Sequence, residues 1–344
     1  MFSGCGGMDL GFKQAGYKIV WANDNDKNAI STYQVNLGEI DDRSITDISS
    51  NEVPDGDIVV GGFPCQPFSN AGNRDGVEDH RGNLFFDCLR IIREKKPKAF
   101  VLENVKGLLS SYTKHGLPII EFIKSELSNV SKDFGYNTTY KLLNASDYGV
   151  PQNRQRVFIV GIRNDLNKQF IFPDAIPKNN LELKWVIGLP RGSKNNEHWE
   201  LSPQQKEMIP YIKEGGSWKD IPYDLLTIRF RKIRDDMKKY HSPNFYRRFS
   251  RNEIVGTITA SAQPENCGII HPTENRRFTI REIARIQTFP EDFEFISSSI
   301  TGMYKMIGNA VPPTMAKLIA TQLKGILLEG KIRKSSKLRQ LELF

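Results

Sequence analysis

A single cysteine stands in a loop whose sequence suits a nucleophile. Cys65 lies within GGFPCQPFS at residues 61–69, directly after an apolar run at residues 57–60 that predicts a buried strand. Prolines on both sides restrict φ, and the two glycines let a ligand approach the backbone closely. A thiol attacks as its thiolate, and α/β proteins bind ligands at strand ends. The alternative is a small buried residue in a proline-rich turn, but the partner residues below favour the nucleophile.

A carboxylate follows the next predicted strand. Residues 98–102 form another apolar run, which leads directly into Glu103. Because the carboxyl ends of parallel strands meet at one edge of a sheet, we expect Glu103 to lie beside Cys65. The alternative is a glutamate that caps a turn. A helix between the two strands is predicted by apolar residues at spacings of three and four, namely Phe85, Cys88, Leu89 and Ile92.

Two arginines alternate into the start of a further strand. Residues 136–143 and 157–162 read as strands, and Arg154 and Arg156 stand just before the second of them. Alternating residues point to the same face, so both side chains could bind a phosphate, a carbonyl oxygen or a carboxylate. A surface ladder of ion pairs is the alternative.

The amino-terminal segment has the composition of a cofactor loop. Glycines 4, 6 and 7 precede a mildly helical stretch, and such glycines let backbone N–H groups approach a bound cofactor. Residues 17–22 predict a strand that ends near Asp24, where an acidic side chain can hold a ribose hydroxyl pair. Taken alone the loop could be an ordinary turn, since its spacing differs from the usual dinucleotide fingerprint.

Composition limits the class of protein. A chain of 344 residues accommodates one large domain or a large and a small one, and 39% apolar with 26% charged residues indicates a soluble globular protein. No apolar run reaches the length of a membrane span and no secretory leader is seen. Four cysteines without paired or metal spacing favour a reducing cytoplasmic compartment, with no disulfide and no metal. A net charge of +8 favours a polyanionic partner.

The composition and the periodicity of the sequence change along the chain and predict its division into domains. We predict a catalytic and cofactor-binding domain at residues 1–163, a smaller irregular domain at 164–276, a return to the first domain at 277–328 and a basic tail at 329–344. The return contains a capping box at residues 279–282 and a final amphipathic helix. Between residues 226 and 251 nine basic residues face two acidic ones and alternate with aromatic residues. This mixture suits DNA phosphates and bases, although a solvated helix face is the alternative, and the predicted contacts are Arg229, Arg231, Lys232, Arg247 and Arg248.

Taken in order, these motifs resemble the cytosine-5 DNA methyltransferases. The resemblance rests on FSGCGG at residues 2–7, PCQ at 64–66, ENV at 103–105, QNRQR at 152–156, REIARIQTFP at 281–290 and GNAVP at 308–312. It implies an α/β fold with a Rossmann-like sheet for S-adenosylmethionine-dependent methyl transfer. It also implies that residues 164–276 are a target recognition domain.

The same resemblance implies a covalent mechanism. A Cys65 thiolate would add to carbon 6 of a flipped-out cytosine and activate carbon 5 as the methyl acceptor. A protonated Glu103 would stabilise ring N3, Arg156 would hold the carbonyl O2, and Arg154 would support the Cys65 loop.

For the cofactor, the family pattern places Phe2 against the adenine, Gly4, Gly6 and Gly7 around the methionine part, and Asp24 on the ribose. Ser44 and Asn25 depart from the pattern, where an aspartate and a large apolar residue are usual, so we expect weaker adenine recognition. The predicted S-adenosylmethionine site comprises Phe2, Gly4, Gly6, Gly7, Asp24, Asn25, Ser44, Ile45, Pro64 and Asn309.

The strand that family members carry before the glycine loop is absent from this sequence, because Met1 directly precedes Phe2. Its absence would leave neighbouring backbone groups unpaired. The hypothesis is that the natural start lies upstream, which in-frame apolar codons before Met1 would support and an immediate stop codon would contradict. If Met1 is the true start, we expect low stability and weak cofactor binding.

Two other functions compete with DNA methylation. A tRNA methyltransferase would use the same motifs, but its Cys-Phe-Thr signature is not found here. A non-catalytic DNA-binding regulator would be expected to have lost at least one of Cys65, Glu103, Arg154 and Arg156. We therefore expect a cytoplasmic, nucleoid-associated modification enzyme that binds double-stranded DNA as a monomer. It would serve a restriction-modification system, with any cognate endonuclease acting independently, or act as an orphan.

Overall fold

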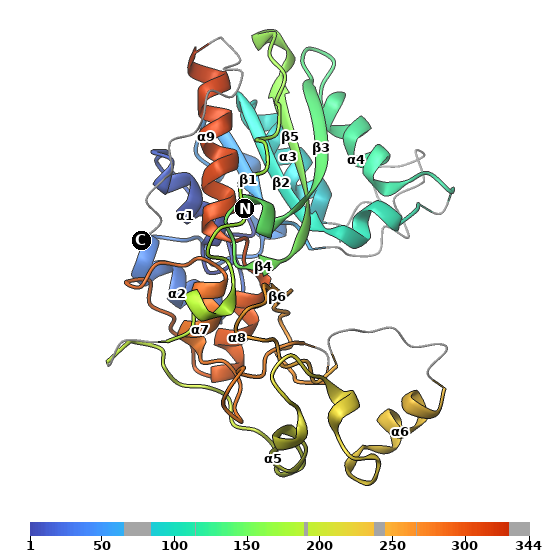
Figure 1. The fold of residues 1–344 in the computed structure, drawn as a ribbon. Helices are drawn as coiled ribbons and strands as arrows, with labels where there is room; N and C mark the ends of the chain where they lie inside the picture. The colour runs from blue at the N-terminus through green and yellow to red at the C-terminus, as the bar shows by residue number, and fades with distance from the viewer. Residues whose placement is uncertain (65–83, 114, 189–191, 237–244, 266, 330–344) are drawn as a thin grey trace.

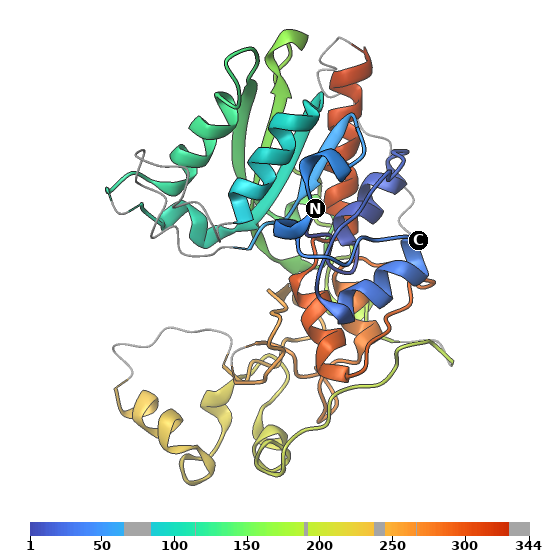
Figure 2. The ribbon, with the colours of Figure 1, turned by 180° about the vertical axis from the view of Figure 1, so that it is seen from behind.

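The computed structural model has two lobes, a larger one around a sheet and a smaller one that carries α5 (Pro203–Met208) and α6 (Ile228–Asp235) (Figure 1; Figure 2). It describes residues 1–64, 84–113, 115–188, 192–236, 245–265 and 267–329. No helix in these ranges is both long and apolar enough to cross a membrane.

The larger lobe is built on a mixed sheet of four described strands in the order β1-β2-β5-β3. β1 (Ile58–Gly61) runs parallel to β2 (Ala99–Val105), while β5 (Gln155–Arg163) is antiparallel to both β2 and β3 (Tyr136–Asn144). The four strands predicted at residues 57–60, 98–102, 136–143 and 157–162 are thereby confirmed. The parallel pairing puts the carboxyl ends of β1 and β2 at one edge of the sheet.

Helices cover both faces of this sheet because its strands are apolar on both sides. On one face Phe100 and Leu102 pack under α3 (Leu84–Lys95) and α4 (Ile119–Ser128). On the other face Ala99 and Val101 pack under α1 (Gly7–Gln14) and α9 (Pro313–Glu329). Figures 1 and 2 show α1 and α9 side by side on their face. The alternation follows from the two-residue period of a strand, and the result is a three-layer α/β sandwich.

The prediction of a strand at residues 17–22 is wrong. The segment forms no strand. Directly after it, Asn23 forms an isolated parallel bridge with Asp41. A strand needs a partner for its backbone groups, and no described strand pairs with this segment. The outer side of β1 is contacted instead by Met1, whose ammonium group donates to the Val60 carbonyl at 2.8 Å.

The carboxyl-terminal part of the larger lobe follows the sequence closely. Thr279 and Glu282 form the predicted capping box of α7 (Ile280–Ile286). α8 (Ile300–Asn309) follows, and α9 buries one apolar face, as predicted, with Met315, Ile319, Leu323 and Ile326. The remaining helix of this lobe, α2 (Lys27–Leu37), is capped by the Asp26 side chain, which accepts from the Asn28 N–H.

The predicted range 164–276 contains two packing units. Apolar side chains between residues 201 and 233, together with Phe245, Tyr246 and Ile270, form a separate core, which includes Trp218 and Phe230. By contrast, Leu183 and several residues at positions 255–269 pack into a core shared with α7 and α8. A short parallel pair, β4 (Gln152–Asn153) with β6 (Val255–Gly256), joins this second unit to the sheet lobe. The target recognition domain remains a proposal, and its independent core is narrower than the predicted range.

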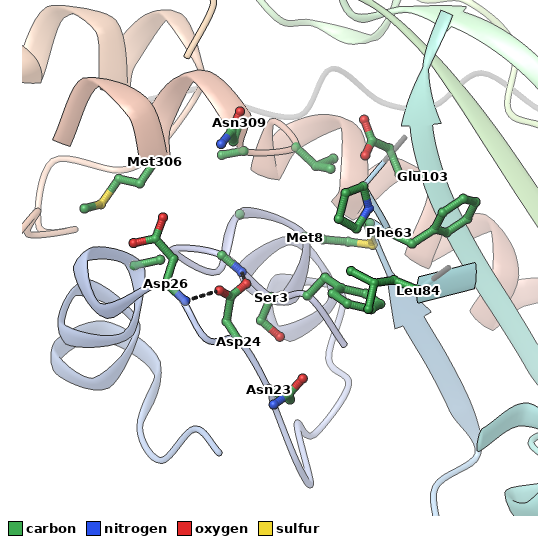
Figure 3. A pocket seen from close by; sticks show the side chains of 18 of the residues that line it. Ser3, Met8, Asn23, Asp24, Asp26, Phe63, Leu84, Glu103, Met306 and Asn309 are labelled. Carbon is green, nitrogen blue, oxygen red and sulfur yellow. Dashed lines mark hydrogen bonds between the residues drawn. The ribbon is translucent and has the colours of Figure 1, made fainter. Parts of the chain in front are cut away.

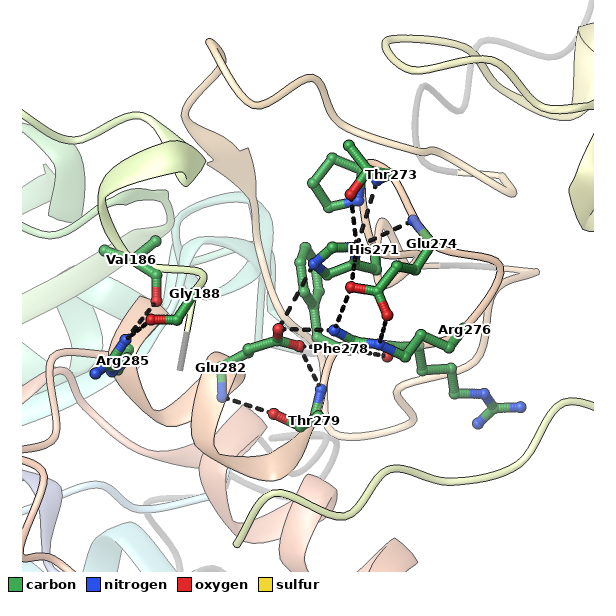
Figure 4. Close-up of polar contacts among 12 residues, drawn as sticks. Val186, Gly188, His271, Thr273, Glu274, Arg276, Phe278, Thr279, Glu282 and Arg285 are labelled. Atoms are coloured by element: carbon green, nitrogen blue, oxygen red, sulfur yellow. Dashed lines mark hydrogen bonds and ion pairs between the residues drawn. The ribbon is translucent and has the colours of Figure 1, made fainter. Parts of the chain in front are cut away.

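A buried histidine links residues 270–279 to α7 (Figure 4). The His271 ring is 5% exposed, and its Nδ1 accepts from the backbone N–H groups of Thr273 and Glu274. Arg276 bridges the carboxylates of Glu274 and Glu282, and Glu282 also lies 3.6 Å from His271 Nε2. Burial and the Arg276 charge lower the pKa of His271, although Glu282 and Glu274 oppose this shift.

We expect acidification to destabilise the protein through His271. Since its folded-state pKa lies below the ordinary value of 6.5, the unfolded state binds more protons as the pH falls below that value. The free energy of unfolding should therefore fall by at most about 1.4 kcal/mol per pH unit between about pH 6.5 and the folded pKa. Urea denaturation of the unchanged protein and of His271→Asn, which keeps an acceptor near Nδ1, measures this effect.

The exposed His115 provides the control, as His115→Asn should keep the full pH dependence. An equally steep loss of stability in His271→Asn would contradict the assignment to His271.

Candidate active site

A cavity of about 460 Å³ lies where α1 and α2 begin, β1 and β2 end, and α8 ends (Figure 3). In Figure 3 Glu103 and Asp24 lie on opposite sides of it. The structure brings most of the predicted site together there, because its lining includes Phe2, Gly4, Gly7, Asp24, Asn25, Ser44, Ile45, Pro64, Glu103, Arg156 and Asn309.

Asp24 is held in place by the glycine loop. Its Oδ2 accepts from the Gly4 N–H at 2.7 Å and its Oδ1 from the Asp26 N–H at 2.9 Å. Gly4 has a φ of 53°, a conformation that side chains rarely adopt, which explains the glycine at this turn. Ser3 lines the same cavity, and its buried hydroxyl has no hydrogen-bond partner among the described residues. The loop therefore presents one fixed carboxylate.

Gly6 does not line this cavity, although the sequence predicted that it would. It has a φ of 94° and precedes α1, and a Cβ built there would meet Leu37 Cδ1 at 2.3 Å. Its small size serves the packing of the loop against α2. Gly7 does line the cavity, and a Cβ there would meet the Val311 carbonyl oxygen at 2.3 Å.

The buried Glu103 and the partly buried Arg156 form an ion pair at the cavity wall. Arg156 Nε lies 2.9 Å from Glu103 Oε1, and register pairs Val105 of β2 with Arg156 of β5. Desolvation raises the pKa of Glu103, although the charge of Arg156 opposes the shift. Burial also lowers the pKa of Arg156. A carboxyl group with a raised pKa beside a cation can donate or accept a proton.

The end of β1 is tied to the end of β2 beside this pair. The Asn104 amide donates to the Phe63 carbonyl at 2.9 Å, and a Cβ on Gly62 would approach Glu103 Oε2 to 3.3 Å. Phe63 and Pro64, the last described residues before Cys65, therefore lie next to Glu103. Cys65 itself lies outside the described residues.

The three described cysteines are poor nucleophiles. Cys5, Cys88 and Cys267 are free and buried. Burial raises the pKa of the Cys5 and Cys88 thiols to about 12 each, and it raises the pKa of Cys267. A thiol activates by losing its proton, so none of these three suits covalent catalysis.

Arg154 joins three segments and lines neither described cavity. It is 1% exposed, and its guanidinium donates to the Ile258 carbonyl at 3.0 Å and to the Gly308 carbonyl at 2.8 Å. It thus ties the segment after β6 to the end of α8. Its predicted contact with the Cys65 loop involves residues outside the described ranges.

Two glutamines that sequence reasoning left without a role complete this junction. Gln152 Nε2 donates to Gln287 Oε1 at 3.1 Å, and Gln152 Oε1 accepts from the Ile258 N–H at 3.0 Å. Gln287 Nε2 donates to the Ile307 carbonyl at 2.8 Å. Both glutamines belong to motifs noted in the sequence, which was the available signal.

The predicted DNA contact by Arg248 is wrong. Its side chain is 4% exposed, and the guanidinium donates to the carbonyls of Ile209, His271 and Glu274. These bonds make it an internal support of the smaller lobe, because a buried arginine with internal acceptors cannot reach a phosphate. Burial also lowers its pKa.

The other four predicted DNA contacts differ in availability. Arg247 pairs with both oxygens of Glu253, at 2.7 and 2.9 Å, and Arg231 donates to the carbonyls of Tyr223, Asp224 and Leu226. Arg229 and Lys232 are exposed on α6, and the Arg229 guanidinium lies over the Phe245 ring at 5.7 Å. Arg229 and Lys232 are therefore the most accessible cations of the predicted set.

Comparison with known proteins gives one family. The model of the C-5 cytosine-specific DNA methylases matches residues 1–325. The Type II methyltransferase M.NgoFVII of Neisseria gonorrhoeae is 41% identical over 325 residues, which cover 91% of this chain and 82% of that protein. The Type II methyltransferase M.MthTI of Methanothermobacter thermautotrophicus is 38% identical over 94% of this chain and 95% of that protein.

Solved structures support the predicted fold. A prophage-encoded DNA modification methyltransferase of Escherichia coli gives a TM-score of 0.62 at 23% identity, over 95% of this chain and 97% of that one. The Dnmt2 methyltransferase of S. pombe gives a TM-score of 0.57 at 20% identity, over 96% of this chain and 97% of that one. The predicted α/β methyltransferase architecture is confirmed by these likenesses together with the sandwich described above.

Proposed function

This chain belongs to the C-5 cytosine-specific DNA methylases, and we propose that it methylates a flipped-out cytosine within a specific short duplex sequence through a covalent Cys65 adduct. The observation that carries the proposal is the Glu103–Arg156 ion pair at the wall of the cavity, beside the end of β1 that leads to Cys65. The acid, the cation and the end of β1 that precedes Cys65 thus meet at one edge of the sheet.

The pair at the cavity wall suits a cytosine ring. Addition of the Cys65 thiolate to carbon 6 forms an S–C bond and moves the electron pair of the 5,6 double bond into the ring. Glu103, with its raised pKa, can hydrogen-bond or protonate ring N3 as this charge develops. Arg156 donates Nε to Glu103 and Nη1 to the Gln155 carbonyl, while its Nη2 has no acceptor among the described residues and could hold the carbonyl O2. After methylation, loss of the carbon 5 proton and elimination of the thiolate restore the aromatic ring.

The opposite side of the cavity fits S-adenosyl-L-methionine, the cofactor of this family, which supplies the methyl group when bound. Asp24, fixed by two backbone N–H groups, would accept from the ribose hydroxyls. A cavity of about 460 Å³ lies within the usual range of about 300–1,000 Å³ for small-molecule sites. We further propose that Phe2, Ser44 and Ile45 surround the adenine and that Asn309 closes the site.

The smaller lobe would hold the duplex. Extrusion of a base costs about a few kcal/mol, which contacts to phosphates and neighbouring bases must offset. The exposed cations on α6, Arg229 and Lys232, are our candidates for these contacts. Relatives named Type II methyltransferases support a role in a restriction-modification system. We further propose that the enzyme acts as a monomer and that any endonuclease acts separately.

Transfer of a labelled methyl group from S-adenosylmethionine tests the proposal. We expect label on unmethylated genomic DNA, none on total tRNA assayed in parallel, and none on DNA with the Cys65→Ser variant. Bisulfite sequencing of the product would then identify the recognition site. Label on tRNA alone, or undiminished DNA methylation by the variant, would overturn the proposal.

A further inference from the structure

A second cavity adjoins the first. It has a volume of about 540 Å³, and the two cavities share Val105 and Arg156 in their linings. The second lies between the carboxyl end of β2, the turn into β5 and Thr257 after β6. It therefore spans the junction of the sheet lobe with the segment that leads to the smaller lobe.

The lining of this second cavity is cationic and rich in amides. Lys106 supplies a positive charge, and Arg156 supplies a second one that is paired with Glu103 behind the lining. Asn153 and Gln155 supply amides, and no lining residue is acidic. Lys106 is exposed and forms no ion pair with any described residue. A site with cations, neutral donors and no carboxylate favours an anion with several acceptor oxygens.

Asn153 in the lining of this cavity is held by its oxygen atoms. Its Oδ1 accepts from Asn144 Nδ2 at 3.2 Å and from Ser146 Oγ at 3.0 Å, and its backbone carbonyl accepts from Thr257 Oγ1 at 2.9 Å. These bonds fix the amide by its oxygen. Its Nδ2 group donates to no described residue and stays available for a ligand.

We propose that this second cavity binds the phosphodiester backbone next to the target nucleotide while the cytosine occupies the first cavity. The inference rests on the proposed function. Lys106 Nζ, Asn153 Nδ2 and Arg156 Nη2 are the donors, and each phosphate carries one negative charge with oxygens that accept from them. Val105, 41% exposed, lies at the boundary of the two cavities and separates the backbone from the base. Because Arg156 lines both cavities, its guanidinium would contact the extruded nucleotide from both sides.

A charge-neutral lysine variant tests the site. Fluorescence anisotropy of a labelled duplex containing the recognition site would compare the unchanged protein with Lys106→Met and with Lys141→Met. Lys141 is exposed on β3 and lines neither cavity, so its variant controls for net charge. We expect Lys106→Met to bind about tenfold more weakly. The plot of log K against log salt should also become less steep, its negative slope shrinking in magnitude by about 0.9. Lys141→Met should match the unchanged protein.

The phosphate partner is identified by removing its charge. Duplexes with a methylphosphonate on either side of the target cytosine would be bound more weakly by the unchanged protein. Lys106→Met should lose no further affinity on the duplex whose modified phosphate Lys106 contacts. Asn153→Asp is the second variant, because it keeps the acceptor for Asn144 and Ser146 but replaces the free amide donor by a carboxylate oxygen. It should bind DNA more weakly than Lys106→Met does.

The outcomes separate the two proposals. If the enzyme methylates DNA but both variants bind every duplex like the unchanged protein, the backbone site is wrong and the proposed function stands. Equal losses from methylphosphonates in Lys106→Met and the unchanged protein would also overturn the site. If the unchanged protein methylates no DNA, both proposals fail. Thermal melting of each variant confirms that it is folded.

Discussion

Replacing Glu103 with glutamine is expected to slow methyl transfer by about 10²- to 10⁴-fold, the usual contribution of a general acid. The Glu103 carboxyl lies at the cavity wall, 2.9 Å from Arg156 Nε, and burial raises its pKa. It can therefore carry a proton toward the base. A glutamine amide can still hydrogen-bond, but it cannot transfer a proton, so the loss should fall on kcat and leave the affinities for DNA and cofactor nearly unchanged.

Labelled-methyl kinetics at saturating DNA and cofactor measure this effect. Glu121→Gln is the matched control, because Glu121 is an exposed carboxylate of α4 that accepts from Tyr140 and lies outside the cavity. The rate of the unchanged enzyme should fall as the pH rises through the raised pKa of Glu103, since the carboxyl then loses its proton. The Glu103→Gln variant should lack this decline. An unaltered kcat would remove Glu103 from the mechanism.

Replacing Arg154 with methionine is expected to destabilise the whole enzyme and to reduce methyl transfer as a consequence. The change leaves the Ile258 and Gly308 carbonyls without their donor, at about 1–3 kcal/mol for each buried acceptor. The gap cannot close easily, because a Cβ on Gly308 would already lie 2.6 Å from the Thr259 backbone. Relief of the desolvation of a buried cation, which lowers the pKa of Arg154, offsets part of this cost.

Urea denaturation and methyl transfer would be measured together for Arg154→Met, Arg154→Lys and Arg163→Met. Arg163 ends β5, the strand that Arg154 precedes, and its guanidinium forms an exposed ion pair with Asp165 and an exposed hydrogen bond to the Lys96 carbonyl. Its loss should cost about 0–1 kcal/mol. Lysine can keep one of the two carbonyl bonds and should restore part of the stability. An unfolding midpoint for Arg154→Met equal to that of Arg163→Met would show that the junction contributes little.

Local patterns in the sequence predicted most of the larger lobe. The apolar residues 99–102 and 157–162, within the predicted runs, are buried on both faces of the sheet, so they predict strands without knowledge of their neighbours. The capping box at Thr279 and Glu282 and the apolar face of α9 are equally local. Each of these features depends on residues a few positions apart, which a sequence displays directly.

The predictions that were wrong depend on contacts between residues that are distant in the sequence. Residues 17–22 have the composition of a strand, but strand formation depends on a partner elsewhere in the chain, and no described strand provides one. Arg248 looked like a phosphate ligand because it stands in a basic run. Carbonyls from residues 209 to 274 surround it in the fold, and they are distant in sequence. The packing of Gly6 against Leu37 was likewise not readable from the glycine motif.

The sequence by itself determined the family, the sheet strands and the residue types of the site, because ordered motifs and short-range periodicity carry that information. Only the tertiary structure decided which of these residues meet. It paired Glu103 with Arg156 across β2 and β5, turned Arg154 toward the junction of the two lobes, and set a second, cationic cavity beside the first. Such contacts join segments up to 154 residues apart. They arise from strand register and from the burial of whole side chains, which no local pattern specifies.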